Sequence, residues 1–184
     1  MKLLLTGGHA GSTAYAFVKF LKKHPPSDRW SITFVGAQSA VEGKQVATLE
    51  SIVLPKLGVT YLPIKAGRLQ MKLTFWGLVS LLKVPVGLIQ AFLIVKKISP
   101  DIILSFGGFV GFPVALAGYL LHIPVVVHEQ TAVMGRANLW SLPFAHTLAI
   151  SRESSRKFIP RYFDQNKVFV TGNPINPDLI GASI

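Results

Sequence analysis

Short apolar runs alternate along the chain with longer stretches whose apolar residues recur at helical spacing. This alternation predicts an α/β fold with a doubly wound parallel sheet, because strands covered by helices on both faces are apolar throughout. Seven strands are expected, at Lys2 to Leu5, Ser31 to Val35, Val59 to Leu62, Ile102 to Ser105, Val125 to His128, Thr147 to Ile150 and Lys167 to Val170. The expected helices are Ser12 to Lys23, Ala40 to Leu49, Leu69 to Leu82, Pro85 to Lys97, Phe112 to Leu121, Ala137 to Leu142 and Ser151 to Phe158.

Two of the predicted strands end abruptly at a glycine pair. The first runs into Gly7 and Gly8, and the fourth runs into Gly107 and Gly108, followed by Phe109. A helix is expected soon after each pair, and a helix N-terminus presents unpaired N–H groups and a partial positive charge. Two such turns in one sheet indicate a crevice for phosphates. The alternative is that the glycines only allow strand and helix to pack closely.

His9 follows the first glycine pair and is a candidate general base, because an imidazole accepts a proton near neutral pH with little tuning. The alternative is a histidine that merely caps the turn. The turn has neither the G-x-G-x-x-G spacing nor the lysine of a P-loop, which disfavours an enzyme with a nucleotide cofactor.

Three consecutive polar residues, His128, Glu129 and Gln130, follow the most apolar strand. Burying such groups without partners costs several kcal/mol, so they meet a ligand or form a hydrogen-bond network with each other. The next loop leads into another helix, with Arg136 as a contact for an anion or the surface. Because the carboxyl ends of parallel strands share one edge, this block and the glycine turns are expected to converge there.

The chain is strongly basic, with 19 Lys and Arg against 8 Asp and Glu and a net charge of +11. No acidic residue lies between Glu50 and Asp101, where lysines alternate with large apolar side chains. Such a mixture favours an anionic membrane surface over nucleic acid; the alternative is a buried helix flanked by solvated lysines. The candidate membrane patch comprises Arg68, Leu69, Lys72, Phe75, Trp76, Val79 and Lys83.

Length, composition and the absence of certain motifs limit the classes of protein to which the chain can belong. The length of 184 residues suits one domain, and the absence of cysteine fits a reducing cytoplasm. The apolar runs on either side of Lys83 and Pro85 are too short to span a bilayer, and the three leucines after Lys2 are too few for a signal peptide. Neither a metal-binding spacing nor a Gly-x-Ser-x-Gly elbow is present, so no metal or other cofactor is expected.

Four segments together resemble the N-terminal, acceptor-side domain of MurG-like glycosyltransferases, glycosyltransferase family 28. They occur in family order over the whole chain and are Thr6 to His9, Phe106 to Pro113, His128 to Asn138 and Thr171 to Pro174. The resemblance implies one Rossmann-like half of a GT-B enzyme that transfers N-acetylglucosamine from UDP-N-acetylglucosamine to lipid I in peptidoglycan synthesis. It also implies inverting chemistry and a peripheral location on the cytoplasmic face of the plasma membrane.

The resemblance also implies roles for particular residues. His9 would be the base that deprotonates the attacking sugar hydroxyl, and Glu129 would be a second catalytic residue. The acceptor diphosphate would lie on Gly7, Gly8, Gly107, Gly108 and Phe109. The acceptor site would be shaped by His128, Gln130, Arg136 and Asn138, and Asn173 would face the donor or the second domain.

The sequence departs from the family pattern at three places. The usual Gly-Gly-Thr-Gly-Gly-His is reduced to one glycine pair before His9, so either the loop is three residues shorter or His9 is shifted. In an ungapped alignment Ser12 takes the histidine position, and His9 is then not the base. The usual Tyr-Val-Ser-Gly-Pro is Phe-Val-Gly-Phe-Pro, and Thr131 replaces an asparagine. A relative with another lipid-linked acceptor is therefore an alternative.

The expected domain covers residues 1–172, with 173–184 as the start of an interdomain linker and no donor-binding domain after it. Alone, this domain is expected to bind an acceptor and a membrane but to transfer nothing. Its partner would be a C-terminal donor domain or a separate donor subunit. A non-catalytic subunit that recruits a partner transferase to the membrane is the rival hypothesis.

Overall fold

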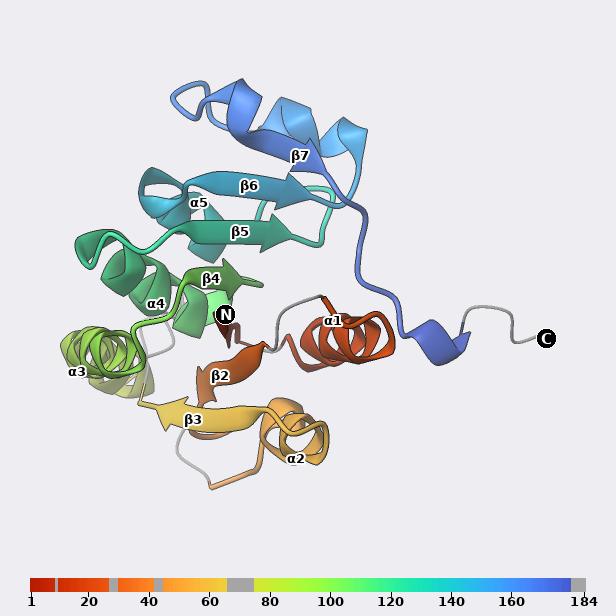
Figure 1. The fold of residues 1–184 in the computed structure, drawn as a ribbon. Helices are drawn as coiled ribbons and strands as arrows, with labels where there is room; N and C mark the ends of the chain where they lie inside the picture. The colour runs from red at the N-terminus through yellow and green to blue at the C-terminus, as the bar shows by residue number, and fades with distance from the viewer. Residues whose placement is uncertain (9, 27–29, 42–44, 66–74, 180–184) are drawn as a thin grey trace.

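The computed structural model describes the chain except for residues 9, 27–29, 42–44, 66–74 and 180–184 and the side chains of 75–83. Its centre is a parallel seven-stranded sheet of order β3-β2-β1-β4-β5-β6-β7 (Figure 1). The strands are β1 (Lys2–Thr6), β2 (Ser31–Ala37), β3 (Thr60–Ile64), β4 (Ile102–Ser105), β5 (Val125–Glu129), β6 (Thr147–Ile150) and β7 (Val168–Val170). All seven predicted strands are confirmed, and so is the doubly wound α/β fold.

Helices cover the two faces of the sheet unequally. On one face lie α1 (Gly11–Lys23) and α2 (Leu49–Lys56), beside β1 to β3. The other face carries α3 (Phe75–Ile98), α4 (Gly108–Leu120) and α5 (Arg136–Ser141) (Figure 1). Four short 3-10 turns complete the described elements, at Leu142–Phe144, Glu153–Phe158, Gln165–Lys167 and Pro177–Leu179.

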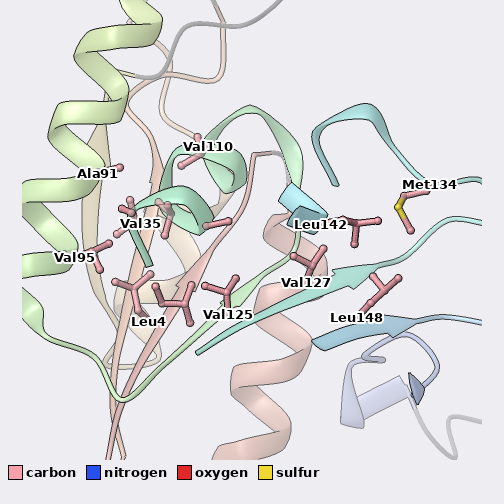
Figure 2. Packing of buried hydrophobic residues seen from close by; sticks show 14 of the residues in the cluster. Leu4, Val35, Ala91, Val95, Val110, Val125, Val127, Met134, Leu142 and Leu148 are labelled. Atoms are coloured by element: carbon pink, nitrogen blue, oxygen red, sulfur yellow. The ribbon is translucent and has the colours of Figure 1, made fainter. Parts of the chain in front are cut away.

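The core follows from the alternation of side chains along each strand. In β1, Leu4 packs toward α3 and α4, whereas its neighbours Leu3 and Leu5 pack toward α1 and α2. Figure 2 shows the larger cluster, where Val95 of α3 and Val110 of α4 meet the strands. Both faces of the sheet's first half are therefore buried, as continuous apolar strands require.

The helix predicted at Ala40 to Leu49 is wrong. Of its described residues only Leu49 is helical, and 42–44 lie outside the described residues. The Ser39 hydroxyl accepts a hydrogen bond from the Val46 amide at 3.0 Å. The helix begins at Leu49 because the Thr48 side chain caps it, accepting a hydrogen bond from the Ser51 amide at 3.1 Å. The apolar spacing alone does not reveal this cap.

The helices predicted on either side of Lys83 and Pro85 form one helix, α3, with Pro85 inside it. A proline removes one backbone donor but does not by itself end a helix that is held by packing. Residues 69–74 of the predicted helix lie outside the described residues. The last predicted helix, at Ser151 to Phe158, is a 3-10 helix over Glu153–Phe158.

The helix after β4 begins at Gly108, four residues before the predicted start at Phe112. Pro113 therefore lies within the helix rather than at its first position. The second glycine pair therefore forms the N-terminus of α4, with Gly107 as the N-cap and Gly108 as the first helical residue.

Candidate anion-binding site at the glycine turns

The order of the sheet reverses between β1 and β4, which are neighbours although α1 to α3 separate them in sequence. In doubly wound sheets, ligands bind beside the carboxyl ends of the strands at this reversal. The two glycine turns follow β1 and β4 and so lie next to each other, as the sequence predicts. The Gly8 amide donates a hydrogen bond to the Gly107 carbonyl at 2.9 Å.

Close packing between the two turns requires glycine. A Cβ on Gly108 would lie 2.6 Å from the Gly8 carbonyl oxygen, and a Cβ on Gly8 would lie 2.9 Å from the Phe109 ring. Both Gly107 and Gly108 also have positive φ, +81° and +78°, which side chains disfavour. Close packing therefore accounts for part of the glycine content of these turns.

The turns also bring two helix N-termini to the same edge of the sheet. Neither α1 nor α4 has an acidic residue in its first turn, and in the described part of the chain no side chain caps either helix. Their first N–H groups and partial positive charges are thus directed at the edge of the sheet where the turns meet. This arrangement suits an anion with more than one phosphate group.

The Glu129 carboxylate is buried and holds the loop that follows it. Its Oε1 accepts from the Thr131 amide at 2.9 Å, and its Oε2 accepts from the Gly135 amide at 2.9 Å and from Asn138 Nδ2 at 2.8 Å. Only 2% of the residue is exposed. Its contacts thus fix the 131–138 loop and the start of α5.

Asn138 connects this loop to the second glycine turn. Its Nδ2 donates a hydrogen bond to Glu129, and its Oδ1 is buried with no hydrogen-bond partner in the described part of the chain. A Cβ on Gly107 would lie 2.4 Å from that oxygen, so Asn138 packs directly against the turn. The conformation of the turn therefore depends on the Glu129–Asn138 pair.

The imidazole of His128 is buried. Its Nε2 lies 3.0 Å from the Gly172 carbonyl, which only accepts, so Nε2 carries the proton. Nδ1 is buried and has no hydrogen-bond partner among the described residues. Burial lowers the pKa of His128 from its ordinary value, and the Gly172 carbonyl and Glu129 oppose that shift.

Gln130 joins three segments at the same edge. Its Nε2 donates to the Phe106 carbonyl at 2.9 Å, directly before the second glycine pair. Its own carbonyl accepts from Asn173 Nδ2 at 3.1 Å. The polar block after β5 is therefore a hydrogen-bond network that ties the glycine turn, the 131–138 loop and the segment after β7 together.

Most of the described candidate residues lie at this edge, with exposed Arg136 at the first position of α5. Sequence reasoning missed Ser105, whose Oγ accepts from the Gly107 amide at 3.2 Å. A Cβ on Gly111 would lie 2.6 Å from that oxygen, so the third glycine of the motif makes room for it. The sequence signal for Ser105 is a serine at the end of a predicted buried strand.

Several predicted residues are not placed. His9, Arg68, Leu69 and Lys72 lie outside the described residues, as do the side chains of Phe75, Trp76, Val79 and Lys83. Within the described ranges, no helix combines the length and the hydropathy needed to cross a bilayer. The same ranges contain no group of His, Asp and Glu suited to hold a metal ion.

Known solved structures share this architecture. MurG from Acinetobacter baumannii aligns with a TM-score of 0.65 and 22% identity, over 94% of this chain and 46% of that one. UDP-GlcNAc 2-epimerase from Neisseria meningitidis, bound to UDP-GlcNAc, also gives 0.65, at 17% identity over 94% and 46% of the two chains. The fold is therefore that of one half of a GT-B protein.

Sequence comparison is more specific. A Legionella pneumophila (strain Lens) protein is 33% identical over 176 residues, 95% of this chain and 44% of the relative. Its name is UDP-N-acetylglucosamine–N-acetylmuramyl-(pentapeptide) pyrophosphoryl-undecaprenol N-acetylglucosamine transferase. A transferase of the same name, numbered 2, from Bacillus cereus is 29% identical over 97% of this chain and 47% of its own length.

The chain thus spans less than half the length of these relatives. Residues 6–150 match the glycosyltransferase family 28 N-terminal domain. Together with the similarity to the two transferases, this match identifies the chain as a member of glycosyltransferase family 28, of which it represents the N-terminal domain.

Proposed function

We propose that this chain is the acceptor-binding domain of an inverting glycosyltransferase that transfers N-acetylglucosamine from UDP-N-acetylglucosamine to lipid I. The observation that carries the proposal is the contact between the two glycine turns, which brings the N-termini of α1 and α4 to the same edge of the sheet. Two helix N-termini with no acidic residue in their first turns suit the two phosphates of a lipid-linked diphosphate. The names of the relatives at 33% and 29% identity supply the sugar and the lipid.

The proposed reaction needs one base on the acceptor side. An acceptor hydroxyl oxygen attacks the anomeric carbon of N-acetylglucosamine, the bond to UDP breaks with inversion, and the hydroxyl proton passes to the base. His9 is the proposed base, because it directly follows Gly8 in the sequence and an imidazole can accept a proton near neutral pH. The diphosphate would be held by the turns that contain Gly7, Gly8, Gly107, Gly108 and Phe109.

We assign Glu129 a positioning role within this site. Its carboxylate accepts three hydrogen bonds from backbone and side-chain N–H groups and is almost fully buried, so it faces the loop rather than the crevice. Asn138 transmits that restraint to Gly107. His128, Gln130 and Arg136 complete the walls of the proposed acceptor site.

The membrane contact proposed from the sequence continues onto the described part of α3. Val86, Ile89 and Leu93 are exposed there at 44%, 61% and 58%, and Lys96 and Lys97 follow at the helix end. Exposed apolar residues next to lysines favour an anionic bilayer surface. The domain would thus lie peripherally on the cytoplasmic face of the plasma membrane, where lipid I is presented.

The donor sugar would be bound elsewhere, by a second domain or subunit that corresponds to the rest of the relatives' length. A direct test joins this chain to the C-terminal half of the Legionella pneumophila relative and measures transfer of N-acetylglucosamine to lipid I. We expect His9→Ala to lower kcat by about a hundredfold or more, as loss of a general base does. His24→Ala, at the far end of α1, is the matched control.

The rival role of a recruiting subunit makes the opposite prediction. If His9→Ala leaves turnover intact while the two halves still assemble on lipid I vesicles, the domain recruits but does not catalyse.

A further inference from the structure

Each glycine turn is preceded by a strand that ends in a buried hydroxyl residue. Thr6 ends β1 and Ser105 ends β4, the two residues are partners in the sheet, and both are fully buried. Side chains alternate along a strand, so Thr6 shares the face of Leu4, and Ser105 shares that of Ile103. This is the face that α4 covers, which places both hydroxyl groups between the sheet and that helix.

The two hydroxyl groups make different hydrogen bonds. Thr6 Oγ1 donates to the Val35 carbonyl at 2.9 Å and so links β1 to β2. Ser105 Oγ accepts from the amide of Gly107, two residues further along the chain, at 3.2 Å. A serine that binds the backbone two residues on forms a local turn of its own. The Thr6 hydroxyl therefore restrains the sheet, whereas the Ser105 hydroxyl restrains the second glycine turn.

The Ser105 hydroxyl fits because residue 111 has no side chain. A Cβ on Gly111 would lie 2.6 Å from Ser105 Oγ, closer than real Cβ atoms approach, but 4.0 Å from Ser105 Cβ, which is an ordinary contact. The conflict is thus with the hydroxyl and not with the rest of the serine. Ser105 and Gly111 therefore act as a pair, in which the glycine leaves the space that the hydroxyl occupies.

Gly107 is held at both of its backbone polar groups. Its amide donates to Ser105 Oγ, and its carbonyl accepts from the Gly8 amide at 2.9 Å. Gly107 is the N-cap of α4 and has no side chain that could cap the helix, so the first amides of α4, starting at Gly108, have no acceptor within it. Donors that are held in place before a ligand arrives bind it without a cost of reorganisation. The second turn is therefore suited as a preformed site for an anion.

We propose that Ser105 is a positioning residue for the acceptor diphosphate: its hydroxyl holds the Gly107 amide, and this hydrogen bond fixes the first amides of α4 toward the phosphates. The inference rests on the proposed function, because it concerns the same site. Ser105 is fully buried, so it acts through Gly107 and not by contact with the ligand. Loss of the hydroxyl would leave Gly107, at φ +81°, free to change conformation, and the ligand would then have to order the turn again on binding.

Nanodiscs of phosphatidylglycerol with and without lipid I test this role on the chain itself. Ser105→Ala should reduce the gain in affinity that lipid I provides by about fivefold, the worth of one hydrogen bond, and should leave binding to nanodiscs without lipid I unchanged. Ser141→Ala is the matched control. Ser141 is also fully buried, but its hydroxyl donates to the Ala137 carbonyl within α5 at 2.8 Å, so we expect no loss.

A second pair of variants separates packing from positioning. Gly111→Ala should lower the urea midpoint of unfolding, because its methyl group meets Ser105 Oγ. The double variant Ser105→Ala with Gly111→Ala should restore most of that midpoint, since the two methyl groups are in ordinary contact. The gain in affinity from lipid I should nevertheless stay about fivefold lower in the double variant, because no hydroxyl holds Gly107.

If Ser105→Ala keeps the wild-type gain from lipid I, the role of Ser105 is overturned while the proposed function stands. Recovery of both the urea midpoint and the lipid I gain in the double variant would also overturn it, since Ser105 would then only pack the turn. A wild-type chain that binds both kinds of nanodisc equally would reject the proposed function, and this role with it. If Ser105→Ala does not fold, the double variant gives the same readout, because its added methyl group fills the space that the hydroxyl leaves.

Discussion

At the scale of single residues, the shape of the site depends on close contacts at three glycines and on one buried histidine. Gly108 contacts the Gly8 backbone, Gly107 contacts Asn138, and Gly111 leaves room for the Ser105 hydroxyl. The buried imidazole of His128 likewise keeps its place by donating one hydrogen bond to Gly172. Substitutions at these positions therefore affect the shape of the site before they affect its chemistry.

Gly108→Ala is expected to lower the free energy of unfolding by about 3 kcal/mol or more, because the new methyl group clashes with the Gly8 backbone and φ is positive. Gly172→Ala is the matched control. Its φ is +75°, but nothing lies within 4 Å of the added Cβ, so only strain of about 1 kcal/mol is expected. Urea unfolding of both variants measures the difference, and equal losses would contradict the packing between the turns.

His128 predicts a dependence of stability on pH. Burial lowers its pKa below the ordinary 6.5, so the folded state binds a proton less readily than the unfolded state. Its contribution to stability is complete above pH 6.5 and is lost as the pH falls below 6.5 toward the lowered pKa. His128→Gln, which keeps an N–H donor, should flatten this part of the curve in urea titrations from pH 7.5 to 5. An unchanged slope would show that His128 does not titrate in this way.

At the scale of elements, strand positions followed from the sequence far better than helix ends. Apolar runs bounded by turn residues identify buried strands directly, because burial on both faces requires them. The start of α2 depends on the Thr48 cap, and the start of α4 depends on glycines with positive φ. The spacing of apolar residues does not reveal these local contacts. The observed starts of α2 and α4 therefore differ from the predicted ones.

The end of α4 provides a prediction at the same scale. His122 follows this helix with φ at +55°, a conformation that glycine adopts more easily, and its side chain is exposed. His122→Gly should raise the free energy of unfolding by about 0.5 to 1 kcal/mol. His146→Gly is the control, since His146 is also exposed but its φ is not positive. A loss of stability in both variants would contradict the assignment.

At the scale of the whole molecule, the two faces of the sheet differ in what they expose. The α3 side presents apolar residues next to lysines. The α1 side instead has an apolar groove, which is lined in part by Leu104, Val126 and Ala149. The convergence of the glycine turns with the polar block followed from strand topology alone and was predictable. The apolar groove was not predictable, because it depends on which face of the sheet each described helix covers.

The α3 face predicts binding to vesicles that contain phosphatidylglycerol. The paired change Ile89→Asp and Leu93→Asp should weaken vesicle binding by about tenfold or more, because two apolar side chains no longer enter the bilayer surface. Ile52→Asp on α2 is the control, at 48% exposure on the other face of the sheet. Sedimentation with vesicles measures both, and equal weakening would contradict a directed membrane contact.

The central claim is that the two glycine turns bind the diphosphate of a lipid-linked acceptor while the donor sugar binds elsewhere. The most direct measurement compares the affinity of this chain for phosphatidylglycerol nanodiscs with and without lipid I, and for UDP-N-acetylglucosamine in solution. We predict that lipid I tightens nanodisc binding by about tenfold or more and that the nucleotide sugar binds only weakly. Equal affinity for both kinds of nanodisc, together with tight binding of UDP-N-acetylglucosamine, would contradict the claim.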